Sequence, residues 1–246
     1  MALITISSEK LQVVISSVGA EIQSVTDAMG RERMWQGDES IWSGRAPILF
    51  PVAGGFRDDK YIFRGKTYPM TKHGFVRRRE WQVESKTENE AVFLMTDKHE
   101  GFPFDYALRA IFRAEGDTLH VTYRVNNLQE DAFYFSIGGH EAYLLPGGIE
   151  QYQVYFDEEE RLDRYVIEGN GILPEPVCMA KRTAGADSGR ICLTCGTNTV
   201  KTGRLRPCVT VIIRWMHWYS SISKAVGWKS GAATAAVSGW RHRSIR

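Results

Sequence analysis

Hydrophobic and polar residues alternate in short runs along the first 160 residues, which is the pattern of β-strands. In 119–125 every second residue is apolar, so Leu119, Val121, Tyr123 and Val125 would share one buried face of a strand. Further short runs are rich in β-branched and aromatic residues, at 11–15, 91–95, 108–112, 133–137 and 152–156. The pattern predicts a protein built mainly from strands.

Turn-forming residues separate these runs. Glycine marks these turns at Gly19, Gly30, 115–117 and 146–148, and Arg64-Gly65-Lys66 predicts the tip of a hairpin. No long stretch repeats its apolar residues at the helical spacing of 3.6. Many short strands at close spacing predict an all-β protein, either a sandwich or a barrel. Without internal repeats or a proline-rich linker, residues 1–246 are interpreted as a single domain.

Composition fits a globular protein. The chain has 246 residues, of which 43% are hydrophobic and 24% charged, which excludes a disordered chain, a collagen-like repeat and a membrane bundle. The longest apolar runs, such as 211–213, are much shorter than the roughly 20 residues that cross a bilayer. The first apolar residues are followed at once by polar Ser7 and Ser8, so no secretory signal is recognised and a cytoplasmic location is expected.

Charge is distributed very unevenly. All 29 Asp and Glu lie in 1–187, giving that part a net charge of −8, whereas 188–246 holds no acidic residue and carries +10. The second part also contains four of the seven Trp, and all four Cys follow residue 177. So sharp a break needs an explanation beyond ordinary surface charge.

Three segments contain candidate chemistry. In 45–51, Arg45 leads into an apolar run bounded by prolines, where a guanidinium could bind hydroxyls or carboxylates at the mouth of a pocket. The plainer alternative is an exposed arginine beside a core strand.

Two histidines lie beside glycines. Gly74 directly after His73 indicates a tight backbone that would fix the angle of the imidazole. His140 follows Gly138 and Gly139 at the end of an apolar run, where glycines could let a ligand approach the backbone. Two such histidines suit proton transfer near neutral pH. The alternatives are a partly buried, hydrogen-bonded histidine at His73 and a structural histidine in a turn at His140.

Other chemistries have little support. Cys192 and Cys195 form a single CxxC without a second pair, which argues against zinc. No glycine-rich phosphate-binding motif is present. The basic, Trp-containing end of the chain could suggest nucleic-acid binding, but it contains no recognisable module. Neither a cofactor nor a metal is expected, and neither a nucleic acid nor a membrane is expected as a partner.

The ordered motifs resemble the aldose 1-epimerase, or galactose mutarotase-like, family, and its shorter bacterial branch most of all. The resemblance rests on the 45–51 run, on His73-Gly74-Phe75 and on 136–140, in that order along the chain. It extends to Val18-Gly-Ala-Glu21, to Met34-Trp35-Gln36-Gly37 and to 101–104, and covers about residues 1–175.

This resemblance implies an all-β fold, a large antiparallel β-sandwich, that binds a hexose and interconverts its α and β anomers by opening the pyranose ring. By position, His140 would be the general acid that protonates the ring oxygen, His73 would hydrogen-bond the same region, and Arg45 would hold sugar hydroxyls. The partner would be a small sugar, an aldohexose.

One required residue is missing from this picture. The family's general base is a glutamate near the C-terminus, yet no Glu follows Glu175 and no acidic residue follows Asp187. Impaired catalysis is therefore expected, and a sugar-binding protein without turnover is the alternative. We expect the residues from about 176 onward to depart from the family pattern, either because they are read in a shifted frame or because they form a genuine basic tail.

Overall fold

A computed structural model describes residues 1–147 and six short strands beyond them. The later strands are β12 (Asp163–Arg164), β13 (Ile167–Glu168), β14 (Gly171–Ile172), β15 (Val177–Cys178), β16 (Cys208–Arg214) and β17 (Ala236–Val237). Residues 152–156, which the sequence predicts to form a strand, lie outside this description.

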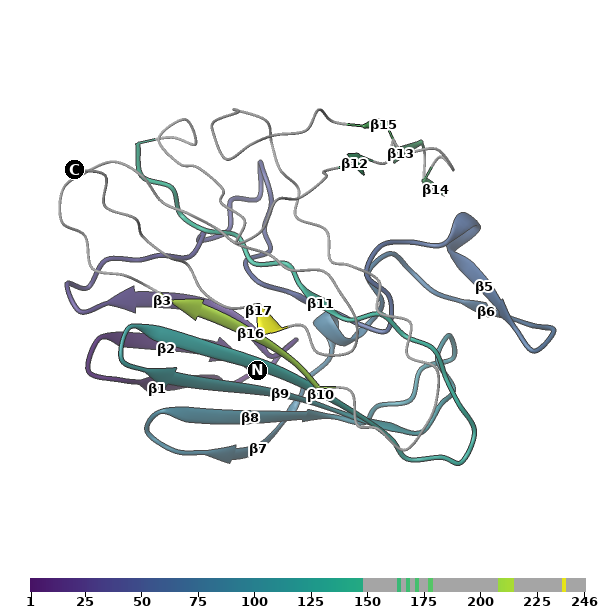
Figure 1. The fold of residues 1–246 in the computed structure, drawn as a ribbon, viewed down its shortest axis with the longest axis horizontal. Helices are drawn as coiled ribbons and strands as arrows, with labels where there is room; N and C mark the ends of the chain where they lie inside the picture. The colour runs from purple at the N-terminus through teal and green to yellow at the C-terminus, as the bar shows by residue number, and fades with distance from the viewer. Residues whose placement is uncertain are drawn as a thin grey trace.

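Two sheets form the body of the protein (Figure 1). The first has the order β1-β2-β3, from β1 (Leu3–Ser7), β2 (Leu11–Ser16) and β3 (Glu21–Asp27). The second has the order β17-β16-β10-β9-β8-β7, with β7 (Gln82–Lys86), β8 (Glu90–Met95), β9 (Tyr106–Glu115) and β10 (Thr118–Asn127). All neighbouring strands are antiparallel except β16 and β17, which are parallel.

The core lies between these two sheets. Alternate side chains of β2 and β3, including Val13 and Val25, belong to the same buried cluster as Phe93 of β8 and Phe112 of β9. The predicted alternation in β10 is confirmed, because Leu119, Val121, Tyr123 and Val125 are at most 2% exposed. The predicted all-β sandwich is therefore correct. The only helices in the described part of the chain are two short 3₁₀ helices, η1 (Arg57–Asp59) and η2 (Val76–Arg78).

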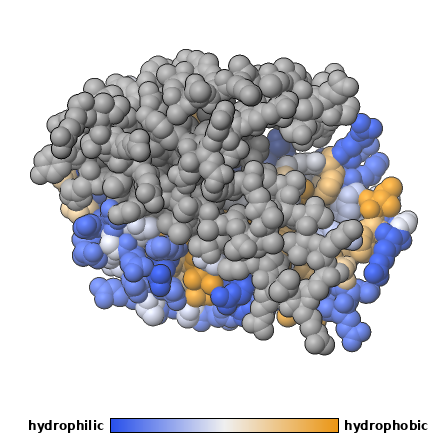
Figure 2. Space-filling view, in the orientation of Figure 1, coloured by the Kyte–Doolittle hydropathy of each residue, from blue (hydrophilic) through white to orange (hydrophobic). Residues whose placement is uncertain are grey.

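Smaller two-stranded ribbons extend from the sandwich. The predicted hairpin is confirmed: β5 (Lys60–Phe63) and β6 (Lys66–Pro69) pair around Arg64 and Gly65, both of which have positive φ. This hairpin projects on the right of the molecule, where exposed apolar side chains gather in the space-filling view and Ile62 is 74% exposed (Figures 1 and 2). The remaining ribbons pair β4 (Ile48–Leu49) with β11 (Gly138–Gly139), β12 with β15 and β13 with β14.

The predicted strand at 133–137 is wrong. Only β11, directly after it, pairs with another strand, whereas Phe133 and Ile137 are buried in the core from an irregular segment. A run of aromatic residues indicates burial, and a strand is only one way to achieve it. Aromatic neighbours fix this segment instead, since Phe133 packs on Phe102 and Phe104.

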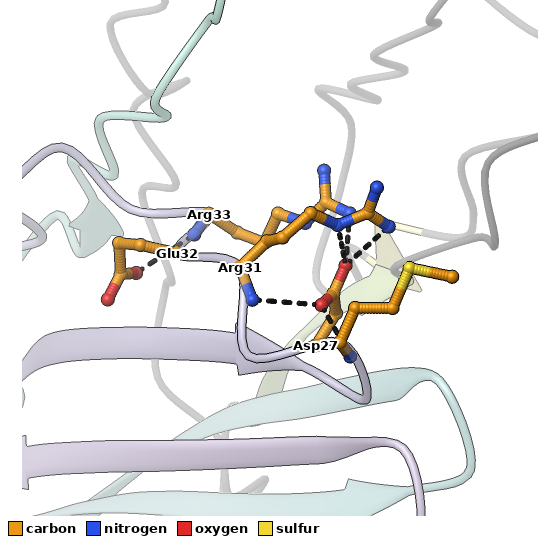
Figure 3. A network of polar contacts seen from close by, with 5 residues as sticks. Asp27, Arg31, Glu32 and Arg33 are labelled. Atoms are coloured by element: carbon orange, nitrogen blue, oxygen red, sulfur yellow. Dashed lines mark hydrogen bonds and ion pairs between the residues drawn. The ribbon is translucent and has the colours of Figure 1, made fainter. Parts of the chain in front are cut away.

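An ionic network closes the end of β3 (Figure 3). The carboxylate of Asp27 accepts hydrogen bonds from the guanidinium groups of Arg31 and Arg33 and from the backbone N–H groups of Met29 and Arg31. Partial burial alone would raise the pKa of Asp27, but these bonds together hold that pKa well below its usual range. The network orders the turn that leads from β3 into 31–35, next to the segment that carries His140.

None of the helices in the described part of the chain is long and apolar enough to cross a membrane.

Candidate functional site

The ribbon formed by β4 and β11 continues beyond these two strands and carries two of the three candidate residues, Arg45 and His140. Gly138 pairs with Leu49 and Gly139 with Ile48, and the pairing continues as the N–H of His140 donates to the carbonyl of Pro47 at 3.2 Å. The N–H of Ala142 then donates to the carbonyl of Arg45 at 2.8 Å. His140 and Arg45 are therefore neighbours along this ribbon, although 95 positions separate them in the sequence.

The ribbon has two distinct faces. Successive residues of an extended chain point to opposite sides, so His140 and Arg45 share one face while Glu141 and Ala46 share the other. The second face is the core side, because Ala46 and Ile48 are buried in the main hydrophobic cluster. The histidine and the arginine are thus presented on the side away from the two-sheet core.

His73 reaches the same region from the loop between β6 and η2. The backbone at Gly74 lies directly against Phe50, at the end of β4, and a Cβ at position 74 would overlap the Phe50 carbonyl oxygen. Both His73 and Gly74 have positive φ, 68° and 71°. The tight backbone expected from the His-Gly pair is present, and the close approach to β4 is its physical reason.

A backbone hydrogen bond fixes the protonation of His73. The N–H of Gly54 donates to Nδ1 of His73 at 3.0 Å, and the N–H of His73 donates to the carbonyl of Gly54 at 2.7 Å. Burial, reinforced by the nearby positive charges of Arg77 and Lys72, lowers the pKa of His73 to about 4. At neutral pH the ring is therefore uncharged, with its proton on Nε2, and it can only donate a hydrogen bond from that atom.

The two histidine rings lie close together. Their centroids are 6.0 Å apart and the ring planes are inclined by 61°. The centroid of the Trp42 indole lies 5.0 Å from the centroid of the His140 ring. The site therefore combines one neutral imidazole of fixed orientation, a second imidazole and an aromatic wall.

Arg45 is held by groups from the first sheet. Its backbone N–H and that of Ala46 both donate to Oε1 of Glu21, at 2.8 and 2.9 Å. Its guanidinium donates to Oε1 of Gln23 and to the carbonyl of Gln36. Arg45 Nε is buried without a hydrogen-bond partner among the described residues. The protein therefore uses two of the five N–H donors of this guanidinium and buries a third, the Nε–H.

Gly139 has a different role from the one that the sequence suggests. A side chain at this position would overlap the carboxyl of Glu141, so the glycine leaves room for that carboxyl rather than for a ligand. Burial raises the pKa of Glu141, and the pKa of Tyr143 is raised by burial and by the neighbouring Glu141. Tyr143 packs against the core, which places Glu141 on the same side, away from the face of His140.

The structure brings His73 and His140 together and places Arg45 on the same ribbon as His140. Sequence reasoning missed Trp42, which lies three positions before Arg45, and missed Glu21 and Gln23, which fix the arginine. Only the pairing of distant segments shows these contacts, so no local signal could have revealed them. Within residues 1–147 and the later strands, no group of three or more His, Cys, Asp or Glu could hold a metal ion.

Comparison with known proteins gives consistent findings. A sequence model of the aldose 1-epimerase family matches residues 2–168. The plasmid and chromosomal LacX proteins of Lactococcus lactis subsp. lactis are each 32% identical to this chain over an alignment of 170 residues, and the match covers 64% of this chain and 57% of theirs.

Solved structures show the same similarity. A galactose mutarotase related enzyme from Lactobacillus acidophilus is 31% identical, with a TM-score of 0.67 over 70% of this chain and 60% of its own. A galactose mutarotase-like protein from Lactobacillus casei is 29% identical, with a TM-score of 0.61 over 78% of this chain and 68% of its own. The match with the LacX proteins spans only 57% of their length.

Proposed function

Because the chain belongs to the aldose 1-epimerase family, we propose that the face carrying His73 and His140 binds an aldohexose and promotes interconversion of its α and β anomers. The reaction opens the pyranose ring by breaking the bond between C1 and the ring oxygen. A proton must reach the ring oxygen while the C1 hydroxyl gives one up, and reclosure on the other face of the aldehyde yields the second anomer.

His140 is the proposed general acid. Its ring packs against Trp42 and His73, and within the described part of the chain its nitrogens form no hydrogen bond. An imidazole nitrogen can both carry and release a proton, so this ring can deliver one to the ring oxygen and recover it on closure. Proton transfer from a positioned group contributes roughly 10²–10⁴-fold to a rate.

His73 is proposed to orient the same oxygen. With Nδ1 occupied by the Gly54 N–H and with its pKa at about 4, the ring offers a fixed Nε2–H donor at neutral pH. A neutral donor can hydrogen-bond the ring oxygen without competing with His140 for the role of acid. Arg45, fixed by Glu21 and Gln23, would hold sugar hydroxyls at the end of the ribbon.

The proton acceptor is the weak part of this site. The resemblance implies a C-terminal glutamate as the general base, and no acidic residue follows Asp187. Glu141, the nearest carboxylate in sequence, lies on the core side of the ribbon. This supports a second candidate function, a sugar-binding protein without efficient turnover, in which the same histidines only bind.

The observation that carries the proposal is the pair of histidine rings at 6.0 Å, one of them orientated by a backbone hydrogen bond. Isothermal titration of the full chain with glucose and galactose tests it. We expect weak binding that Arg45→Ala and His140→Asn each reduce. Heats that are the same for the wild type and for both variants would refute sugar binding at this site.

A further inference from the structure

Trp42 is held firmly in a short loop beside the site. Its N–H donates to the carbonyl of Asp38 at 2.6 Å, and its own carbonyl accepts the indole N–H of Trp35 at 2.8 Å. The Asp38 carboxylate closes the loop by accepting hydrogen bonds from the backbone N–H and hydroxyl of Ser40. The loop therefore fixes the position of the Trp42 ring.

The neighbouring backbone is shaped to receive this ring. A Cβ at Gly44 would lie 2.5 Å from Cζ2 and 2.8 Å from Cε2 of the Trp42 indole. Gly44 is not in the left-handed region, so its backbone conformation does not itself demand glycine. Glycine at position 44 allows the Trp42 indole to pack against the backbone, because any larger residue would displace the indole.

Trp42 differs from the other tryptophans that the structure describes. Trp81 is buried in the core and its indole N–H donates to the carbonyl of Val76, while the indole N–H of Trp35 donates to Trp42 itself. Trp42 is only half-buried, lies outside the core cluster and donates no indole hydrogen bond within the described part of the chain. Neither core packing nor an indole hydrogen bond to the described residues therefore explains a tryptophan at this position, although its ring packs closely against Gly44.

The position of the ring supplies an explanation. The indole lies 5.0 Å from the His140 ring, inclined by 54°, so the two rings form adjoining walls rather than a stack. The centroid of the His73 ring lies 6.0 Å from that of the His140 ring. Ligand sites commonly combine aromatic walls with a few polar groups that fix orientation, and this corner has both.

We propose that Trp42 is a sugar-binding residue whose indole packs against the C–H face of the hexopyranose while its N–H donates to a sugar hydroxyl. This inference rests on the proposed function and adds a substrate contact to it. A pyranose has apolar C–H groups on its ring faces and hydroxyls around its edge, which matches an aromatic face with one polar handle. The contact would hold the ring oxygen beside His140.

Equilibrium titration of the full chain with glucose and galactose tests this contact. We expect Trp42→Ala to weaken affinity by about 10-fold, the size of an aromatic contact of about 1.4 kcal/mol. Trp42→Phe, which keeps an apolar wall but loses the N–H, should weaken it by about 3-fold. Gly44→Ala should act in the same direction as Trp42→Ala, because it displaces the ring without altering Trp42.

Ile41→Ala is the matched control, since Ile41 belongs to the same loop and is 74% exposed. It should bind sugar as the wild type does. Intrinsic fluorescence gives a second readout that does not need a stable Trp42→Ala variant: sugar should change the emission of the wild type and not that of Trp42→Phe.

The outcomes separate the two proposals. Sugar binding that is unchanged in Trp42→Phe and Gly44→Ala, with the same fluorescence change, would overturn the role of Trp42 and leave the histidine site intact. An absence of any sugar binding by the wild type would refute the proposed function, and the inference would fall with it.

Discussion

The ring of His73 shows how backbone contacts set the chemistry of one residue. Gly74 after His73 allows a tight turn, and the sequence alone predicts that much. The protonation of the ring was not predictable, because it depends on the N–H of Gly54, 19 positions earlier, and on burial beside Arg77. Likewise, Gly139 suggested room for a ligand, whereas its neighbour Glu141 fills that room.

His73 should make folding stability depend on acid. The unfolded chain takes up a proton at this residue as the pH falls below about 6.5, whereas the folded protein does so only near pH 4. The unfolded state binds more protons in that window, so the free energy of unfolding should fall as the pH drops from 6.5 to 4. Urea denaturation at pH 7 and pH 5 measures this fall.

His73→Asn is the matched variant, because asparagine tolerates positive φ, does not titrate and can accept the Gly54 N–H. Its free energy of unfolding should decline less between pH 7 and pH 5 than that of the wild type. Equal declines in the two proteins would contradict the lowered pKa of His73.

Among the elements, the strands were predictable and the ribbon at the site was not. Alternation identifies β2, β8, β9 and β10, since a sheet with one buried face requires a period of two. The β4–β11 ribbon has two residues in each strand, and it is too short and too rich in glycine to give such a pattern. Its pairing is set by packing around Phe50 and by the loop at Gly74.

Gly74→Ala tests this close packing. A methyl group at position 74 would overlap the Phe50 carbonyl oxygen, so the variant should lose about 3 kcal/mol of stability or more. Gly30→Ala is the control: Gly30 has the same φ of 71°, but no atom lies within 4 Å of the added methyl. Backbone strain alone should cost that control about 1–2 kcal/mol.

Urea denaturation of both variants separates strain from overlap. Similar losses for Gly74→Ala and Gly30→Ala would mean that the loop can move away from β4, and that His73 is not held as described.

At the scale of the whole molecule, the break in composition bears directly on the proposed function. The family match ends at residue 168, shortly before the acidic residues stop at Asp187. At the frequency found in 1–187, 59 consecutive residues without Asp or Glu would be very rare by chance. In favour of a genuine tail, residues 208–214 form β16, which pairs with β10 in the second sheet.

We expect that the gene is read in a shifted frame from between about codons 175 and 190. One of the other two frames should then encode alternating strands, several acidic residues and a glutamate that could act as the base. Sequencing this region and translating all three frames is the measurement. If neither alternative frame does so, the basic tail is authentic and the expectation is wrong.

We propose that this chain retains the sugar-binding groups and the acid of an aldose 1-epimerase site and lacks the base. Polarimetry of freshly dissolved α-glucose with the full chain, beside His140→Asn, tests it most directly. We expect a small acceleration of mutarotation that His140→Asn abolishes, since the acid remains while a contribution of roughly 10²–10⁴-fold from the base is lost. An acceleration that persists unchanged in His140→Asn would contradict it.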